Sequence, residues 1–148
     1  MPAISNHVAR LTSMLLESLL TIDCLRVYGP NDVRGRGGTV AFNIDDVPYW
    51  TVEEFARERG VAVRGGCFCN PGASETAFGI DAATASRCLD AVDASFTVER
   101  FANCLERNVG AVRISLGLAN NEEDVRRAVA VVRELSRRRL SDGATLAS

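Results

Sequence analysis

Two segments of the chain alternate between apolar and polar residues, and this pattern constrains the fold more than any other feature. Residues 39–44 read TVAFNI and residues 111–118 read AVRISLGL. Alternation divides the side chains of the second segment between two faces, with Val112, Ile114 and Leu116 on one and Arg113 and Ser115 on the other. Strands of this kind are typical of a sheet that packs against a hydrophobic core on one face only.

Helical periodicity and turn residues surround these strands. Apolar residues at helical spacing predict a first helix from Ile4 to about Leu20. A strand over residues 24–28 is expected to pair as a hairpin with residues 39–44. A helix follows that begins with a Thr51–Glu54 capping box and ends at Gly60, and a strand over residues 61–64 comes next. The remaining expected elements are helices near residues 82–92 and 97–107 and a last helix capped by Asn120 or Asn121.

This order of elements predicts an α+β fold, with a small mixed or antiparallel sheet and helices packed on one face. We expect one domain over residues 1–140 and a flexible tail over residues 141–148.

Charge and hydropathy exclude two classes of function. The net charge of −2 argues against a general nucleic-acid binder, which is usually basic. No apolar run approaches the roughly 18 residues of a membrane helix, and the start, MPAISNHVARL, lacks the pattern of a signal peptide. We therefore expect a cytoplasmic protein that contacts neither nucleic acid nor membrane.

The basic residues are all of one type. The chain has 17 arginines and no lysine. It therefore cannot form an internal Schiff base through a lysine amine.

The five cysteines form an odd set in a chain without an export signal, which favours free thiols over a disulfide framework. Three of them lie in apolar strand or helix patterns and are expected to be small buried hydrophobes: Cys24, Cys88 and Cys104. We expect no metal site, because the chain has no Cys-x-x-Cys motif and a single histidine, His7.

The other two cysteines lie in the segment VRGGCFCNPGA, residues 63–73. Gly65 and Gly66 allow a ligand or another backbone to approach closely, and the cation of Arg64 favours the reactive thiolate form of a neighbouring cysteine. Cys69 is the main candidate nucleophile. Cys67 is either an accessory group or a buried structural residue.

Arg113 is the second candidate. On the polar face of its strand it either faces solvent or presents its guanidinium fork to a substrate carboxylate. Arg34 and Arg36 could bind a phosphate, but no strand-to-helix phosphate loop surrounds them, which favours a plain hairpin connection.

Several of these motifs occur together in one known family. The segments GTVAFNIDD, EEFARERGVA, VRGGCFCNPGA and VRISLGLANNEEDV occur in the order found in that family. In this respect the chain resembles the small C-terminal domain of class V pyridoxal-phosphate enzymes of fold type I, the cysteine-desulfurase-like aminotransferases, from about Ile4 to Leu135. The wording GCFCNPGA looks most like the molybdenum cofactor sulfurase branch.

The resemblance implies a role for three residues. Cys69 matches the cysteine that accepts sulfur as a persulfide, Arg64 matches an arginine near that site, and Arg113 matches the arginine that holds the carboxylate of the amino-acid substrate. The implied cofactor is pyridoxal phosphate, and the implied partners are a lysine-bearing large domain or subunit and a sulfur acceptor. A homodimer is also expected, because a domain that packs on a larger one exposes an apolar surface.

The chain departs from the family pattern in three ways. Gly65 stands where threonine is common, the region between Cys69 and Arg113 is longer than in simple desulfurases, and the lysine-bearing large domain is not present. We therefore expect no activity from this chain alone. Two alternatives remain open, a class V transaminase, epimerase or lyase domain with structural cysteines and a freestanding persulfide carrier.

Overall fold

The structure is a computed structural model that describes residues 2–66, 78–92, 97–106 and 109–145. The described chain forms two compact units. The first comprises Met1–Gly65 and Val112–Ser148, and the second comprises Gly66–Ala111. We describe each unit by itself.

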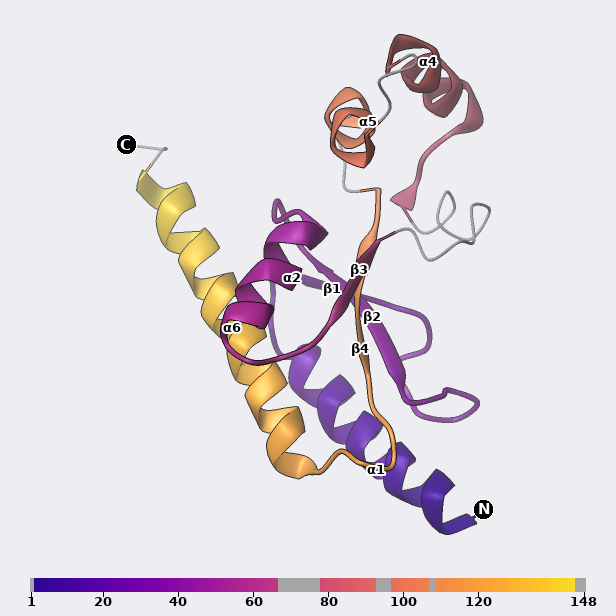
Figure 1. Ribbon diagram of the computed structural model, residues 1–148, viewed down its shortest axis with the longest axis vertical. Coiled ribbons are helices and arrows are strands. Elements are labelled where there is room, and N and C mark those ends of the chain that lie inside the picture. The colour runs from indigo at the N-terminus through magenta and orange to yellow at the C-terminus, as the bar shows by residue number, and fades with distance from the viewer. Residues whose placement is uncertain (1, 67–77, 93–96, 107–108, 146–148) are drawn as a thin grey trace. The chain divides into compact units, whose positions relative to one another are not determined.

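The first unit is built on a four-stranded sheet with strand order β1-β2-β4-β3 (Figure 1). The strands are β1 (Leu25–Tyr28), β2 (Thr39–Ile44), β3 (Arg64–Gly66) and β4 (Ala111–Ser115). β2 pairs antiparallel with β1 and with β4, which confirms the predicted hairpin and the α+β class. The strand predicted over residues 61–64 begins only at Arg64.

One face of the sheet forms the hydrophobic core. Val40, Phe42 and Ile44 of β2 are fully buried, as is Val112 of β4, and Ile114 is 4% exposed. The intervening residues Thr39 and Ser115 are exposed, as the period-two pattern predicts.

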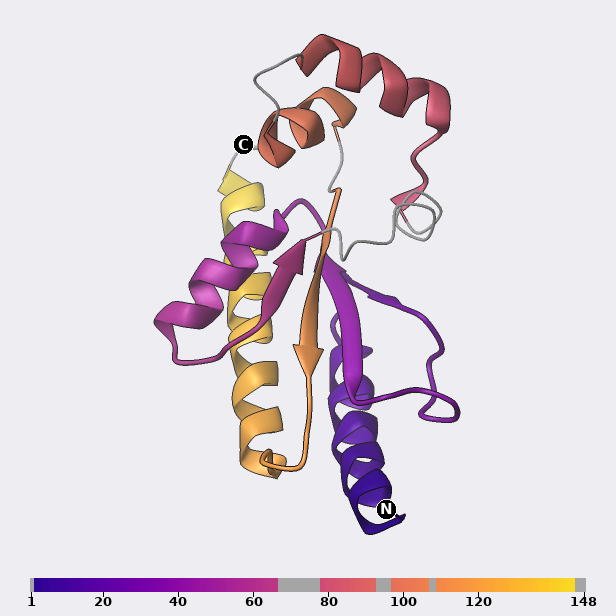
Figure 2. The ribbon, with the colours of Figure 1, turned by 45° about the vertical axis from the view of Figure 1, so that its right-hand side comes forward.

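Three helices cover this core face (Figures 1 and 2): α1 (Pro2–Leu19), α2 (Tyr49–Glu58) and α6 (Glu122–Thr145). Each presents an apolar stripe to the sheet. The fully buried apolar side chains of the stripes on α1 and α6 are Leu11, Leu15, Leu16, Leu19 and Val125. Each such side chain contributes roughly 1.5–3 kcal/mol of transfer free energy, so these stripes hold the helices in place.

The start of α2 differs from the prediction. The helix begins at Tyr49, with Pro48 as a cap that makes no side-chain hydrogen bond, so the expected capping box of Thr51 and Glu54 is wrong. The backbone N–H of Thr51 already donates to Pro48 O, so the first helical turn forms two residues before the predicted start. The end is as predicted, with Gly60 in the left-handed region at φ +68.

An ion pair holds α2 against α6. The Nε and Nη2 atoms of Arg59 donate to the two carboxylate oxygens of Glu134, each at 3.0 Å. These hydrogen bonds lower the pKa of Glu134. Because α2 contacts both α6 and β3, the pair also supports the strand that leads into the cysteine segment.

Asn121 is the residue that caps α6. Its Oδ1 accepts from the backbone N–H of Glu123 at 2.8 Å, and Asp124 Oδ2 accepts from the backbone N–H of Asn121 at 3.0 Å. The other candidate, Asn120, instead accepts from the backbone N–H of Gly117. The helix ends at Thr145.

The second unit contains α4 (Ala82–Val92) and α5 (Val98–Leu105), as predicted. The side chain of Thr97 caps α5 by accepting from the backbone N–H of Arg100. Cys88 of α4 and Cys104 of α5 form a disulfide, so the expectation of free thiols is wrong for this pair.

The reason for this correction is tertiary. The two helices contact each other, which brings the Cα atoms of Cys88 and Cys104 to 5.7 Å, a normal separation for a bridge. Cys24, in contrast, is free and buried, as expected.

Within the described ranges, no helix is both long enough and apolar enough to cross a bilayer.

The polar face of the sheet as a candidate active site

The sheet face opposite the core carries the polar side chains of three strands. Its members are Arg26, Tyr28, Thr39, Asn43, Arg113 and Ser115, together with Ala41. The register places Tyr28 opposite Ala41, and Ala41 opposite Arg113. Arg113 and Tyr28 therefore lie on one row, separated by a residue whose side chain is a single methyl group.

Arg113 is the third residue of β4, and its side chain is half-buried. It was one of the two main candidates, and the structure places it on the polar face, as the alternation predicts. A guanidinium remains protonated at all physiological pH values and offers a planar fork of donors. Held on a strand beside a small residue, this fork is suited to bind a carboxylate.

Tyr28 and Asn43 form a polar pair on the same face that sequence reasoning missed. Asn43 is buried, and its Nδ2 donates to the Tyr28 hydroxyl at 3.1 Å. Burial raises the pKa of Tyr28 and outweighs the nearby Arg26 cation, which lowers it. The alternation of TVAFNI predicts that Asn43 lies on the same face as Ala41. That Tyr28 lies on this face as well follows only from the pairing register of β1 and β2.

Arg64 opens β3, the neighbour of β4 in the sheet, and its side chain is exposed. The next residue, Gly65, packs against α2. A Cβ atom at Gly65 would overlap Tyr49 Cδ2 and would lie 3.2 Å from Tyr49 Cε2. The Tyr49 ring fills the space that a side chain at this position would need.

Cys67 and Cys69 lie outside the described residues. They follow Gly66, the last residue of β3, by one and three positions in the chain. Of the candidate residues, the structure thus places Arg64 and Arg113 on adjacent strands of the first unit and gives no position for the two thiols.

The remaining candidates have structural contacts. Arg34 binds Asp32 through its backbone N–H and its guanidinium, and Arg36 donates to Tyr28 O, so both arginines hold the β1–β2 connection together. His7 contacts the backbone oxygen of Asn120 at 2.9 Å. In the part of the chain that the structure describes, no cluster of histidine, cysteine and acidic side chains could hold a metal ion.

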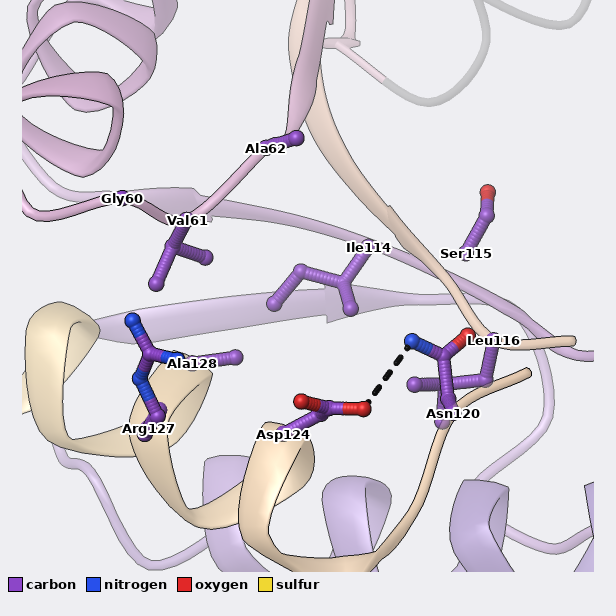
Figure 3. Close-up of a pocket in the computed structure, with 10 residues that line it drawn as sticks. All are labelled: Gly60, Val61, Ala62, Ile114, Ser115, Leu116, Asn120, Asp124, Arg127 and Ala128. Atoms are coloured by element: carbon purple, nitrogen blue, oxygen red, sulfur yellow. Dashed lines mark hydrogen bonds between the residues drawn. The ribbon is translucent and has the colours of Figure 1, made fainter.

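A pocket of about 180 Å³ lies elsewhere in the first unit, between the α2–β3 connection, the end of β4 and the start of α6 (Figure 3). Its walls include the apolar side chains of Val61, Ile114 and Ala128. The amide of Asn120 donates to the Asp124 carboxylate at 3.4 Å, so these two polar groups already bind each other. Neither Arg64 nor Arg113 lines this pocket.

Comparison with known proteins agrees with this architecture. Over 67 residues the chain is 42% identical to a probable cysteine desulfurase of Staphylococcus epidermidis, in an alignment that covers 45% of this chain and 16% of that protein. It is 31% identical to molybdenum cofactor sulfurase 2 of Aedes aegypti, with 90% of this chain and 19% of that protein covered. The chain thus spans less than a fifth of the length of these relatives.

A solved structure shares the fold. The apo cysteine desulfurase of Thermococcus onnurineus NA1 matches with a TM-score of 0.62 at 21% identity, covering 90% of this chain and 26% of that one. Residues 1–128 match the family model for aminotransferase class-V. The chain therefore belongs to the aminotransferase class-V family.

Proposed function

We propose that this chain is the small domain of a pyridoxal-phosphate-dependent class V enzyme of the cysteine desulfurase type, and that it contributes a carboxylate-binding arginine and a sulfur-accepting cysteine. The observation that carries the proposal is the position of Arg113 on the polar sheet face, opposite Ala41. The similarity to a probable cysteine desulfurase and to a molybdenum cofactor sulfurase supports the sulfur chemistry.

Arg113 holds the α-carboxylate of the amino-acid substrate. Two parallel N–H···O bonds fix both the position and the plane of the carboxylate, which a lysine ammonium cannot do. The backbone of Arg113 lies in the central part of the sheet, so the side chain starts from a rigid support.

Cys69 accepts the sulfur, and Arg64, five residues earlier, favours its thiolate form. A bond forms between the thiolate and the substrate sulfur while the carbon–sulfur bond of the substrate breaks, and Cys69 is left as a persulfide. Cys67 is an accessory thiol at most in this scheme.

Pyridoxal phosphate, when bound, supplies the electron sink for this chemistry. This chain has no lysine to anchor it. The coenzyme therefore belongs to a lysine-bearing large domain, which fits the small share of the relatives that the chain covers. This chain then orients the substrate and accepts the sulfur.

The test is to assemble the chain with a lysine-bearing large domain and to assay sulfide release from cysteine. Replacing Arg113 with lysine removes the fork and keeps the charge. A charge-assisted hydrogen bond contributes roughly 1.5–3 kcal/mol, so kcat/KM should fall about ten- to hundredfold. The matched control, Arg126→Lys on the exposed surface of α6, should leave kcat/KM unchanged.

Two outcomes contradict the proposal. Sustained turnover by the chain alone contradicts the need for a large domain. Unchanged turnover in the assembled Cys69→Ala enzyme contradicts sulfur acceptance, and it favours a transaminase, epimerase or lyase with structural cysteines.

A further inference from the structure

The disulfide of the second unit joins two residues with different access to solvent. Cys88 of α4 is 5% exposed, whereas Cys104 of α5 is an exposed residue. A thiolate attacks a disulfide along the sulfur–sulfur axis and requires access to the sulfur that it attacks. Of the two bridged residues, Cys104 is therefore the one that is open to solvent.

The helices that the bridge joins are short. α4 has 11 residues and α5 has 8, and isolated helices shorter than roughly 12–15 residues are marginal in water. The apolar side chains that they bury are small in number and size, namely Val92, Ala102 and Leu105 with Cys88, while Leu89 remains 49% exposed. Side-chain burial alone is therefore a weak support for this pair.

The first unit is different. It has a continuous core of leucine, valine, isoleucine and phenylalanine side chains from α1, α6 and the sheet. Loss of the disulfide should therefore affect α4 and α5 without unfolding the first unit.

We propose that low-molecular-weight thiols reduce the Cys88–Cys104 disulfide by attacking the Cys104 sulfur. When the disulfide is reduced, α4 and α5 lose their structure. The proposal does not depend on the function proposed for Cys69 and Arg113.

The reaction is a thiol–disulfide exchange in two steps. The thiolate of a molecule such as glutathione bonds to the Cys104 sulfur, the Cys88–Cys104 bond breaks, and Cys88 leaves as a thiolate that takes a proton. A second glutathione thiolate then attacks the glutathione sulfur of the mixed disulfide. This step releases oxidised glutathione and leaves Cys104 as a thiol, so two glutathione molecules supply both electrons.

The first experiment locates the bridge in the intact chain. The protein is alkylated in native buffer without reductant and cleaved after arginine, which yields the separate peptides 88–100 and 101–107. We expect these two peptides to be linked, whereas Cys67 and Cys69 fall in another peptide, residues 65–87. Recovery of the two peptides without a link between them would overturn the proposal.

The second experiment locates the attack. The oxidised chain is mixed with limiting reduced glutathione and quenched at short times with an alkylating agent. We expect the trapped adduct to carry glutathione on Cys104 and the alkyl group on Cys88. An adduct that carries glutathione equally on both cysteines, or mainly on Cys88, would refute the assigned site of attack.

The third experiment measures the structural consequence by amide hydrogen exchange. In excess reduced glutathione, residues 82–92 and 98–105 should lose protection while α1 and α6 keep theirs. The double variant Cys88→Ser/Cys104→Ser should show the same loss without any reductant, and Cys24→Ser, which leaves the bridge intact, should not. Full protection of α4 and α5 in the reduced protein would show that the disulfide does not maintain the structure of these helices.

Discussion

Replacing Gly65 with alanine tests how α2 packs on the strand that leads to Cys67 and Cys69. The added Cβ would overlap Tyr49 Cδ2 and lie 3.2 Å from Cε2, where carbon atoms normally approach to about 3.5–4.0 Å. Glu53 Oε2, at 3.1 Å, is the end of a flexible side chain and can move away. The Tyr49 ring packs against the core and has less freedom, so the overlap must displace it.

The magnitude follows from two opposing effects. Overpacking costs roughly 1–3 kcal/mol. Gly65 does not lie in the left-handed region, so its backbone accepts alanine and the less flexible unfolded chain returns about 0.4–1 kcal/mol. We therefore expect Gly65→Ala to lower the free energy of unfolding of the first unit by about 0.5–2 kcal/mol.

Urea unfolding followed by the fluorescence of Trp50 measures this change. Trp50 is the single tryptophan, and its ring lies 5.0 Å from the Tyr49 ring, so its emission reports on the displaced region. Gly37→Ala is the matched control, because a Cβ there would meet nothing within 4 Å and Gly37 also lies outside the left-handed region. It should leave stability unchanged or slightly higher.

A double-mutant cycle with Tyr49→Ala isolates the overlap. In the Tyr49→Ala background, Gly65→Ala should no longer destabilise the protein. If Gly65→Ala costs the same free energy in both backgrounds, to within about 0.5 kcal/mol, the contact with Tyr49 is not the reason for glycine at this position.

Three further changes test other parts of the structure. Phe42→Ala removes a fully buried ring from the core and should cost about 3–5 kcal/mol in urea unfolding; a loss below 1 kcal/mol would contradict its central place. Asn121→Ala removes the cap of α6 and should cost about 1 kcal/mol, whereas Asn120→Ala should not weaken the same backbone N–H groups, as amide exchange can show. Burial raises the pKa of Tyr28 above its ordinary value of 10.0. The contribution of the protonated Tyr28 side chain to the free energy of unfolding is therefore present below pH 10.0 and is lost as the pH rises through the pKa of the folded state. Unfolding measured against pH should show this loss in the wild type and a smaller loss in Tyr28→Phe.

Much of the fold could be predicted from local pattern. The alternation of TVAFNI and AVRISLGL and the helical spacing of Leu11, Leu15 and Leu19 are properties of short segments, and the structure confirms the elements that they predict. One error, the start of α2, concerns the same local scale. The sequence offers two starts for this helix, the Thr51–Glu54 capping box and Tyr49 after Pro48. The helix begins at Tyr49, and the packing of Tyr49 on Gly65 agrees with this start.

The candidate site divides in the same way. The face on which Arg113 lies follows from alternation alone, since successive side chains of a strand must point to opposite sides. Its neighbours do not, because Tyr28 reaches the row of Arg113 only through the β1–β2 and β2–β4 registers.

The sequence by itself determined the elements, the polar face of β4 and the absence of a lysine anchor, because each depends on residue types and their spacing along the chain. The tertiary structure alone decided which side chains from distant parts of the sequence are in contact. Tyr49 fills the space over Gly65, and Cys88 meets Cys104 across two helices. Such contacts depend on how the elements pack, so they cannot be predicted from the periodicity of the sequence.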